Sequence, residues 1–396
     1  MISNTTRSGR IRKNLSGEKA YGSFIPADLP PVPEIVVDEA MTRLITRVRE
    51  LLARLEGEAL HIPNMEIFLS MYVRKEALFS SQIEGTQATL DDILDPLLEA
   101  NANRDVAEAS DNVKAVLFAL EQLRDPRGLP LCLRLLRETH VVLLEHARGS
   151  DKSPGVFRTT QNWIGPTGCT LKSAAYVPPN PEDMMAALHA LEAYLHADSP
   201  LDPLVRAGLI HYQFETIHPF LDGNGRIGRL LILLFLLDQQ VISAPYLYIS
   251  YFLKLNRTQY YEHLTSVREN GTYEAWLKFF LMAAEAAAKD ALETIGRLHA
   301  LGEATKRALT EGVKGKVRVE KRLAFLAYIE KKPILDIGLT AKELGWSFPT
   351  TSKFVKTFVE AGILKEISGR VRGRVFAYDA YLSILRKDTE PLNVAS

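Results

Sequence analysis

The chain has 396 residues, with 48 Lys and Arg against 48 Asp and Glu, so its formal net charge is zero at neutral pH. Hydrophobic residues make up 46% and charged residues 24%, which is the composition of an ordinary globular protein with room for two or three domains and excludes a wholly disordered chain. The charge is uneven, because Lys314–Lys387 holds 16 Lys and Arg against 7 Asp and Glu. This basic C-terminal region favours an acidic partner.

The cysteine content and the apolar runs bear on the compartment. Two cysteines, Cys132 and Cys169, supply neither a disulfide framework nor metal-ligand spacing, so we expect a reducing, cytoplasmic environment. The first residues, MISNTTRSGRIRKN, contain no apolar run and do not predict a secretory signal. The longest apolar stretch, Leu230–Leu237, is far shorter than the ~20 residues of a membrane span, so we expect a buried helix there and no membrane partner.

The first two thirds of the chain predict a mainly α fold. Residues 1–17 are polar and basic and predict a mobile tail, and FIPADLPPVP (Phe24–Pro33) predicts an extended segment laid over a surface. From Glu34 the apolar residues recur every three or four positions, which predicts an amphipathic helix that ends at Gly57. Further helices are predicted at about 62–82, 90–98, 103–123, 130–147, 181–196, 201–217, 226–240, 256–268 and 272–298.

One segment between these helices has the character of a β-hairpin. Val156–Pro179 contains Trp163, Ile164, Thr170 and Tyr176, with glycines and a proline between them. An isolated two-stranded hairpin is marginal unless something holds it. We therefore interpret this segment as a flap that lies over a site.

The C-terminal part predicts a separate unit. Residues 299–316 are polar and predict a linker, and residues 317–387 then predict helices at 319–331, 340–345 and 349–361, followed by two short strands around SGRVRG. This order is that of a winged helix-turn-helix, which contacts DNA through its third helix and its wing. The basic side chains available for DNA phosphates are Lys353, Lys356, Arg370, Arg372 and Arg374. The alternative stays open that the unit docks against its own catalytic domain or binds a protein.

The most informative stretch is HPFLDGNGRIGR, His218–Arg229. It forms a loop between two helices, because Pro219 disfavours continuation of the first helix and a long apolar helix follows Gly225. The segment Gly223–Gly225 can adopt positive φ angles and turn backbone N–H groups inward, which together with the helix N-terminus makes an anion cradle.

The charged side chains of the same stretch complete a phosphate site. Arg226 and Arg229 lie three apart at the helix start, and guanidinium groups match phosphate oxygens. Asp222 is the hard oxygen ligand that a phosphate-bound Mg²⁺ requires, and His218 is suited to removing a proton from a hydroxyl. A bare DGNG would equally be an ordinary turn with a buried histidine, but the register of these charged residues disfavours that interpretation.

These residues resemble the full signature of the Fic family, enzymes that transfer AMP from ATP to protein hydroxyls. The matching positions are His218, Pro219, Phe220, Asp222, Gly223, Asn224, Gly225, Arg226, Gly228 and Arg229. The resemblance covers roughly 20–300 and includes YGSFIPADLPP, GVFRTTQNWIG and LNRTQYYEHL. It implies a Fic-type helical bundle with a β-hairpin flap, an N-terminal helical region at 18–125, a catalytic core at 126–298, and ATP and Mg²⁺ as ligands.

The resemblance also implies a role for each residue. His218 is then the base that deprotonates a Ser, Thr or Tyr hydroxyl of a target protein or of the chain itself. Asp222 holds Mg²⁺, the segment 223–225 forms the anion hole, and Arg226 and Arg229 orient the β- and γ-phosphates. The full implied nucleotide-binding set is Gln213, His218, Pro219, Phe220, Leu221, Asp222, Gly223, Asn224, Gly225, Arg226, Arg229, Asn256 and Tyr260.

Several positions refine this implied activity. Gln213 would reach the ribose, and Asn256 and Tyr260 would line the nucleoside pocket. The flap would hold the target segment by strand addition, which fixes its hydroxyl in line with the α-phosphate. Relatives that phosphorylate their target carry lysine at the position of Gly225, so glycine favours transfer of the whole AMP group.

A second stretch, SSQIEGT (Ser80–Thr86), resembles the inhibitory motif of Fic proteins that carry their own inhibitory helix. Alone it would be a helix end with Glu84 as a surface acid. The resemblance implies instead that Glu84, with Ser80 one turn earlier, pairs with Arg229 inside the nucleotide site and prevents productive ATP binding. Some inhibited relatives also remove AMP from their target.

Two hypotheses of different classes follow. The first is an autoinhibited protein adenylyltransferase whose winged helix recruits a target or partner. The second is a DNA-binding regulator whose Fic core senses ATP and modifies little besides itself. The target, the modified residue type, de-AMPylation and a homodimer all stay open.

Overall fold

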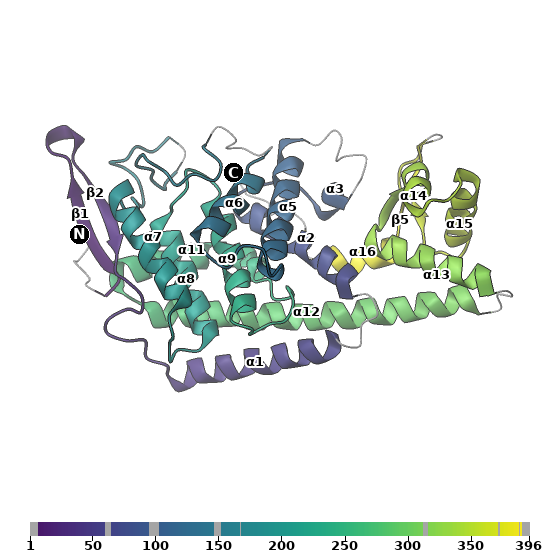
Figure 1. The fold of residues 1–396 in the computed structure, drawn as a ribbon, viewed down its shortest axis with the longest axis horizontal. Helices are drawn as coiled ribbons and strands as arrows, with labels where there is room; N and C mark the ends of the chain where they lie inside the picture. Colours follow the sequence, from purple (N-terminus) through teal and green to yellow (C-terminus); the bar gives the residue numbers. More distant parts are fainter. Residues whose placement is uncertain are drawn as a thin grey trace.

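The structure is a computed structural model that describes residues 7–59, 65–94, 103–145, 152–166, 168–311, 316–370, 373–387 and 389. Most of these residues lie in a helical bundle, as predicted. A long helix, α12 (Tyr273–Thr310), runs along most of the length of the molecule, with α1 (Glu39–Ala59) packed along it on the lower side in Figure 1. No helix in these ranges combines the length and apolar content that crossing a membrane requires.

The bundle surrounds two consecutive buried helices, α8 (Pro203–Ile217) and α9 (Asn224–Asp238). Every residue from 204 to 217 is buried, and so is nearly all of α9. The helices around them are α2 (Met65–Ile83), α3 (Leu90–Leu94), α5 (Arg104–Arg124), α6 (Leu133–Leu143), α7 (Pro181–His196), α10 (Ser250–Leu255) and α11 (Arg257–Asn270). The short α10 was not predicted. The buried pair α8–α9 positions the loop between them, which carries His218–Arg229.

Local signals explain where several helices begin. The Asn180 side chain accepts a hydrogen bond from the Asp183 N–H, and the Asp202 side chain accepts one from the Leu204 N–H. In both helices proline follows as the first helical residue, where its missing N–H has no intrahelical partner to lose. These caps place the start of α8 within two residues of the prediction.

The predicted linker at 299–316 is wrong over most of its length, because α12 continues without a break to Thr310. The segment is polar but rich in strong helix formers such as Ala, Leu, Glu, Lys and Arg. Thr305 and Leu309 are buried on one side of this extension, and Leu309 packs in the same core as the C-terminal helices. The polarity therefore marked an exposed helix face rather than a linker.

The prediction of a mobile tail at 1–17 is wrong from Arg7 on, and residues 1–6 lie outside the described residues. The segment predicted to be extended from Phe24 differs only at its start, where Phe24–Pro26 belong to a strand. β1 (Gly9–Asn14) pairs antiparallel with β2 (Tyr21–Pro26) in an N-terminal hairpin. Ion pairs hold it to distant helices, since Arg12 contacts Asp183 at 2.7 Å and Arg7 contacts Glu274 at 2.6 Å. GRIRKN has a single large apolar residue, so hydrophobic alternation gave no signal for this strand.

The predicted flap hairpin is reduced to one bridge. Ile164 and Tyr176 exchange both backbone hydrogen bonds, at 2.8 and 3.0 Å, and no longer ladder forms over the described part of the segment. The flap is held from two sides, because the Tyr176 hydroxyl donates to the Thr216 carbonyl oxygen and the Phe24 N–H donates to the Val177 carbonyl oxygen.

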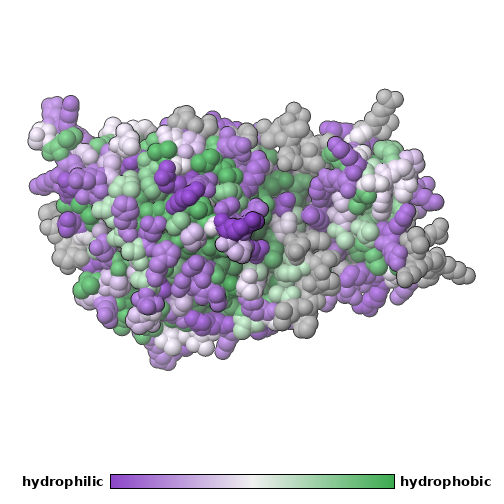
Figure 2. Space-filling view, viewed as in Figure 1, coloured by the Kyte–Doolittle hydropathy of each residue, from purple (hydrophilic) through white to green (hydrophobic). Residues whose placement is uncertain are grey.

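The C-terminal module, residues 316–389, lies at the far end of α12 (Figure 1). Its elements are α13 (Lys316–Lys331), β3 (Ile334–Asp336), α14 (Ile337–Leu344), α15 (Phe348–Glu360), β4 (Lys365–Glu366), β5 (Val375–Ala377) and α16 (Asp379–Leu385). The three predicted helices and two predicted strands occur in the predicted order, and β3 joins them in an antiparallel sheet of order β3-β5-β4. Hydrophilic side chains dominate its surface on the face in Figure 2. Arg372 lies outside the described residues.

Candidate functional site

The loop between α8 and α9 begins with a residue in a left-handed conformation. His218 caps α8 with φ 50° and ψ 60°, and its N–H donates to the Phe214 carbonyl oxygen at 2.9 Å. The next helix is capped by Gly223, whose φ of 73° favours glycine. The chain therefore reverses within a few residues, and the imidazole and the N-terminus of α9 belong to the same turn.

Two side chains hold the middle of the loop. The Asn224 side chain accepts from the Phe220 N–H at 2.8 Å and donates to the Phe220 carbonyl oxygen at 2.9 Å, so it clamps the loop backbone. The buried Phe220 ring stacks on His140 at 3.8 Å between centroids. The side-chain amide of Asn224 thus makes its hydrogen bonds within the loop. The donor of Asn224 that can bind an anion is its backbone N–H.

His140 of α6 joins this loop to the base of the flap. Its Nδ1 accepts from the Gly155 N–H at 2.9 Å, so the proton of the neutral ring sits on Nε2, which donates to the Asp222 carbonyl oxygen at 3.0 Å. Burial lowers the pKa of His140 to about 4, which keeps the ring neutral at physiological pH.

The N-terminus of α9 offers an anion site beside an open carboxylate. The N–H groups of the first helical residues, Asn224, Gly225 and Arg226, have no partner inside the helix. The side chain of Asp222 is 37% exposed, and its Oδ1 accepts from the Gly223 N–H at 2.6 Å. Among the described residues no three His, Cys, Asp or Glu side chains cluster to hold a metal. The carboxylate of Asp222 is a hard oxygen ligand that is open to solvent.

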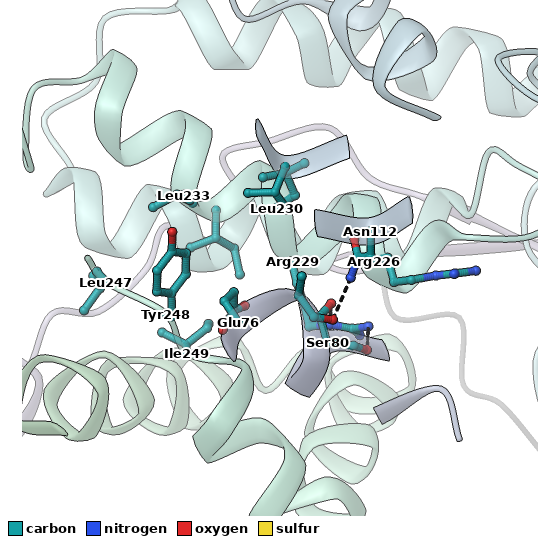
Figure 3. A pocket seen from close by; sticks show the side chains of 13 residues that line it. Glu76, Ser80, Asn112, Arg226, Arg229, Leu230, Leu233, Leu247, Tyr248 and Ile249 are labelled. Carbon is teal, nitrogen blue, oxygen red and sulfur yellow. Dashed lines mark hydrogen bonds between the residues drawn. The ribbon is translucent and has the colours of Figure 1, made fainter. Parts of the chain in front are cut away.

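The two arginines of the loop are buried and each contacts an acid from the N-terminal helices. Arg226 Nη1 lies 2.9 Å from Oε1 of Glu108 on α5, and its Nη2 lies 3.4 Å from Oδ1 of Asp222. Arg229 Nε donates to the Ser80 hydroxyl at 2.9 Å and its Nη2 to the Ser80 carbonyl oxygen at 2.8 Å (Figure 3).

Glu84 follows the last residue of α2 and completes the contacts of Arg229. Its Oε1 accepts from Arg229 Nη2 at 2.7 Å, with Arg229 1% exposed and Glu84 35% exposed at the side chain. A Cβ atom added to Gly225 would lie 2.2 Å from the same Oε1 and 2.9 Å from Arg229 Nη1. The Glu84 carboxylate therefore touches the backbone of the anion site. Arg229, Arg226 and Ser80 also line a small cavity of about 10 Å³ behind the loop (Figure 3).

The electrostatic surroundings keep His218 neutral. Burial lowers its pKa to about 4, and the charge of Arg158 adds to this effect. Glu84 acts in the opposite direction. Nδ1 of His218 is buried and has no hydrogen-bond partner among the described residues.

The remaining predicted residues lie around this centre in different ways. Leu221 is partly exposed at the tip of the loop, and Asn256 ends α10 with its amide donating to the Phe252 carbonyl oxygen at 2.9 Å. Gln213 is buried and its amide donates to the Ala27 carbonyl oxygen at 2.8 Å. Tyr260 is fully buried, and its hydroxyl bonds His211 Nε2 at 2.9 Å. Gln213 and Tyr260 therefore face protein groups.

Sequence reasoning assigned no role to three buried residues that hold the loop or its arginines: Arg158, His140 and Glu108. Arg158 stood inside GVFRTTQNWIG, a stretch that the resemblance included without a role for each position. His140 and Glu108 lie in ordinary amphipathic helices, where a single polar residue on a buried face gives no local signal. Their contacts join residues 80 to 120 positions apart, which one sequence does not reveal.

Comparison with known proteins agrees with this geometry. Residues 130–236 match the Fic/DOC family model and residues 42–121 match the Fic/DOC family N-terminal model. A protein adenylyltransferase Fic from Drosophila grimshawi is 31% identical over 155 residues, which is 38% of this chain and 28% of the relative. Another from Nematostella vectensis is 31% identical over 176 residues, 44% of this chain and 37% of the relative. These alignments span well under half of the relatives' length.

A solved structure shares the fold. The crystal structure of a Fic family protein from Desulfovibrio desulfuricans G20 covers 87% of this chain and 97% of its own, with a TM-score of 0.54 at 20% identity. Two family models match in chain order, one over the segment that contains Glu84 and the other over the segment that contains His218, so residues 42–121 and 130–236 of this chain are Fic/DOC family regions.

Proposed function

We propose that the chain transfers AMP from ATP to a hydroxyl group of a protein, either a separate target or the chain itself. The observation that carries this proposal is the loop 218–229, in which a neutral imidazole and the N-terminus of α9 share one turn. The relatives named protein adenylyltransferase Fic support the same activity, and ATP is the substrate that this activity requires.

In the proposed reaction His218 Nε2 accepts the proton of the target hydroxyl. The hydroxyl oxygen forms a bond to the α-phosphorus, while the bond from that phosphorus to the oxygen of the pyrophosphate leaving group breaks. The N–H groups that begin α9 and the guanidinium groups of Arg226 and Arg229 stabilise negative charge on the phosphate oxygens. Pro219 and Leu221 belong to the same loop and would lie at the edge of the bound nucleotide.

Mg²⁺ would be held by Asp222, whose open carboxylate suits a cation shared with phosphate. When bound, Mg²⁺ neutralises charge on the α- and β-phosphates. Asp222 also accepts from Arg226 and from the Gly223 N–H, so its carboxylate is oriented before any ligand arrives.

The nucleoside would lie towards α10 and α11. Asn256 stands at the junction of these helices and stays the candidate that contacts the nucleoside directly. Since Tyr260 and Gln213 are bonded to protein groups, they support the pocket wall from behind. Tyr261 is the partly exposed neighbour of Tyr260, and the charges of Glu84 and Arg229 both act on it.

The activity is proposed to be inhibited by Glu84. Its carboxylate engages Arg229 and touches Gly225, and a triphosphate needs both positions. The Arg229 guanidinium outweighs the opposing effect of burial and lowers the pKa of Glu84, so the acid is charged at physiological pH. Removal of AMP from a target by the same site belongs to this proposal, with Glu84 then orienting a water.

The target is proposed to lie along the flap. Trp163 is 42% exposed and Ile164 39% exposed, and the preceding Asn162 donates to the Phe220 carbonyl oxygen of the loop at 3.1 Å. The single bridge at Ile164 leaves strand positions of the flap unpaired with another strand, and these suit strand addition by a target segment.

DNA binding is the second candidate function, proposed for the C-terminal module as a winged helix. Lys353 and Lys356 are exposed on α15, and Arg370 lies in the segment between β4 and β5. Retention on duplex DNA at ~50 mM salt that is lost steeply by ~200 mM would support phosphate contacts. A Lys353→Glu, Lys356→Glu variant with unchanged retention would exclude this face.

The principal proposal is tested with ATP labelled at either the α- or the γ-phosphate. The Glu84→Gly variant with Mg²⁺ is expected to label protein from α-labelled ATP only, because AMP and not phosphate is transferred. The Glu84→Gly, His218→Ala variant is expected to give no label. Equal labelling by both variants, or labelling from γ-labelled ATP, would exclude AMP transfer by His218.

A further inference from the structure

Arg158 is a buried arginine that the proposed mechanism does not yet use. It is 2% exposed, and every hydrogen bond its side chain makes in the described residues goes to a backbone carbonyl oxygen. Its Nε donates to the His218 carbonyl oxygen at 3.0 Å, and one Nη2 contact reaches the Ile217 carbonyl oxygen at 3.4 Å. Its backbone N–H also donates to the Pro219 carbonyl oxygen at 2.9 Å.

We infer that Arg158 is a positioning residue for His218: its guanidinium binds the carbonyl end of α8, fixes the left-handed turn from which the imidazole projects, and places a positive charge beside that turn. The last carbonyl groups of a helix have no intrahelical partner and attract a cation. A non-glycine residue with positive φ is strained, so His218 needs such an anchor. This inference rests on the proposed function, in which His218 is the base.

Charged and polar groups from several elements act on the His218 imidazole in opposite directions. Arg268 of α11 disfavours the protonated ring, whereas Glu84 beyond α2 and the backbone carbonyl of Glu215 in α8 favour it. Arg158 is the largest of the charge effects, second only to burial. Removing its charge while keeping the protein folded is therefore expected to move the titration of His218 towards its ordinary range.

The test follows the imidazole by NMR in the absence of nucleotide, so it does not depend on AMP transfer. His218 is one of nine histidines, and its resonance is identified by its loss in His218→Ala. Arg158→Gln is expected to raise the midpoint of the His218 titration by about one pH unit. Arg158→Lys keeps the charge and is expected to retain the low midpoint of that titration. Arg206→Gln is the matched control, because Arg206 is equally buried and binds the carbonyl end of α7.

Activity in the Glu84→Gly background separates the two parts of the inference. Arg158→Gln is expected to move the acid limb of the pH profile upward, and Arg158→Lys to lower kcat without moving that limb. A wild-type midpoint near the ordinary ~6.5, or an equal midpoint in wild type and Arg158→Gln, would overturn the inference even if no variant transfers AMP.

A second, independent observation concerns the helix that carries Glu84. Gln82 is the second-to-last residue of α2 and is buried, and its amide donates to the carbonyl oxygens of Thr389 at 2.8 Å and Ala88 at 2.9 Å. Arg386, at the end of α16, makes a bidentate contact with Asp91 of α3, both bonds at 2.8 Å. The C-terminal module thus touches α2 within two residues of Glu84.

Apolar packing extends this contact. Met71 and Leu78 of α2 and Leu90 of α3 share one core with residues of the C-terminal module, including Tyr381 and Leu385. We propose that the C-terminal module holds the end of α2 in place and thereby sets the strength of the Glu84–Arg229 contact. A ligand that pulls the module away from α2 would weaken that contact.

The test compares Asp91→Ala with Asp379→Ala. Both remove a partner of Arg386 at 2.8 Å, but Asp379 lies inside the module and does not reach α3. Asp91→Ala is expected to raise AMP transfer about 2- to 5-fold, with no further rise in the Glu84→Gly background, because the pair is partly exposed. Gln82→Met, which breaks a buried contact, is expected to give a larger rise.

Hydrogen exchange of residues 78–84 supplies a readout that does not require AMP transfer. Asp91→Ala and Gln82→Met are expected to increase the exchange rate of these residues by the same factors by which they raise AMP transfer. Asp379→Ala is expected to leave the exchange rate at the wild-type value. Equal exchange in all four proteins would overturn the proposal, and so would a rise in AMP transfer that persists when Glu84 is already glycine.

Discussion

Replacing Glu84 by glutamine removes the charge of the proposed inhibitory contact while keeping its shape. The contact is a 2.7 Å bond to Arg229, with the arginine 1% and the acid 35% exposed at the side chain. A hydrogen bond between charged groups contributes about 1.5–3 kcal/mol, and the exposure of Glu84 places this one near the lower end. A loss of about 1.5–2 kcal/mol shifts the equilibrium towards the nucleotide-competent state roughly 10- to 30-fold.

The initial rate of label transfer from α-labelled ATP measures this shift. Glu84→Gln is expected to raise the rate about 10- to 30-fold, and Glu84→Gly further, because glycine also vacates the space beside Gly225. Glu274→Gln is the control, since it removes another Arg–Glu pair, to Arg7 at 2.6 Å, far from the loop. Equal rates for wild type and Glu84→Gln, in protein that binds ATP, would refute the reasoning.

Two further predictions concern stability. Gly228→Ala would place a Cβ 2.4 Å from Oε1 of Glu215, so urea denaturation is expected to show a free energy of unfolding lower by about 1–3 kcal/mol. Gly296 has open space around it in α12, so Gly296→Ala is expected to raise the free energy of unfolding by about 0.5–1 kcal/mol. Burial raises the pKa of Glu76 to about 8 from 4.5, so its contribution to stability is full below pH 4.5 and is lost as the pH rises towards 8. Wild type is therefore expected to lose about 4 kcal/mol relative to Glu76→Gln over that range, and parallel pH profiles would contradict this.

The positions of α8, α9 and the loop between them were predictable because their signals are local. Asp202 and Pro203 mark the start of α8, and Pro219 marks its end. Gly223 and Gly225 lie a few residues before the apolar run Leu230–Leu237, which predicts a buried helix. Each signal lies within a few residues of the feature that it predicts.

The parts that could not be predicted depend on contacts between distant segments. Nothing in GRIRKN indicates a strand, since its stability comes from a partner strand and from Asp183. The resemblance implied that Tyr260 lines the nucleoside pocket, but its hydroxyl forms a hydrogen bond with the buried His211. The burial of a tyrosine hydroxyl requires such a partner, and the partner lies in a different helix.

The same contacts indicate which part of the site moves when a nucleotide enters. Asn224, His140 and Arg158 hold the loop by buried hydrogen bonds, and breaking any of them would leave polar groups unsatisfied at about 1–3 kcal/mol each. Glu84 instead follows the end of α2, precedes Gly85 at φ 103°, and already meets solvent. If a triphosphate binds at the N-terminus of α9 as proposed, it is therefore expected to displace the Glu84 carboxylate and to leave the loop, with its imidazole, in place.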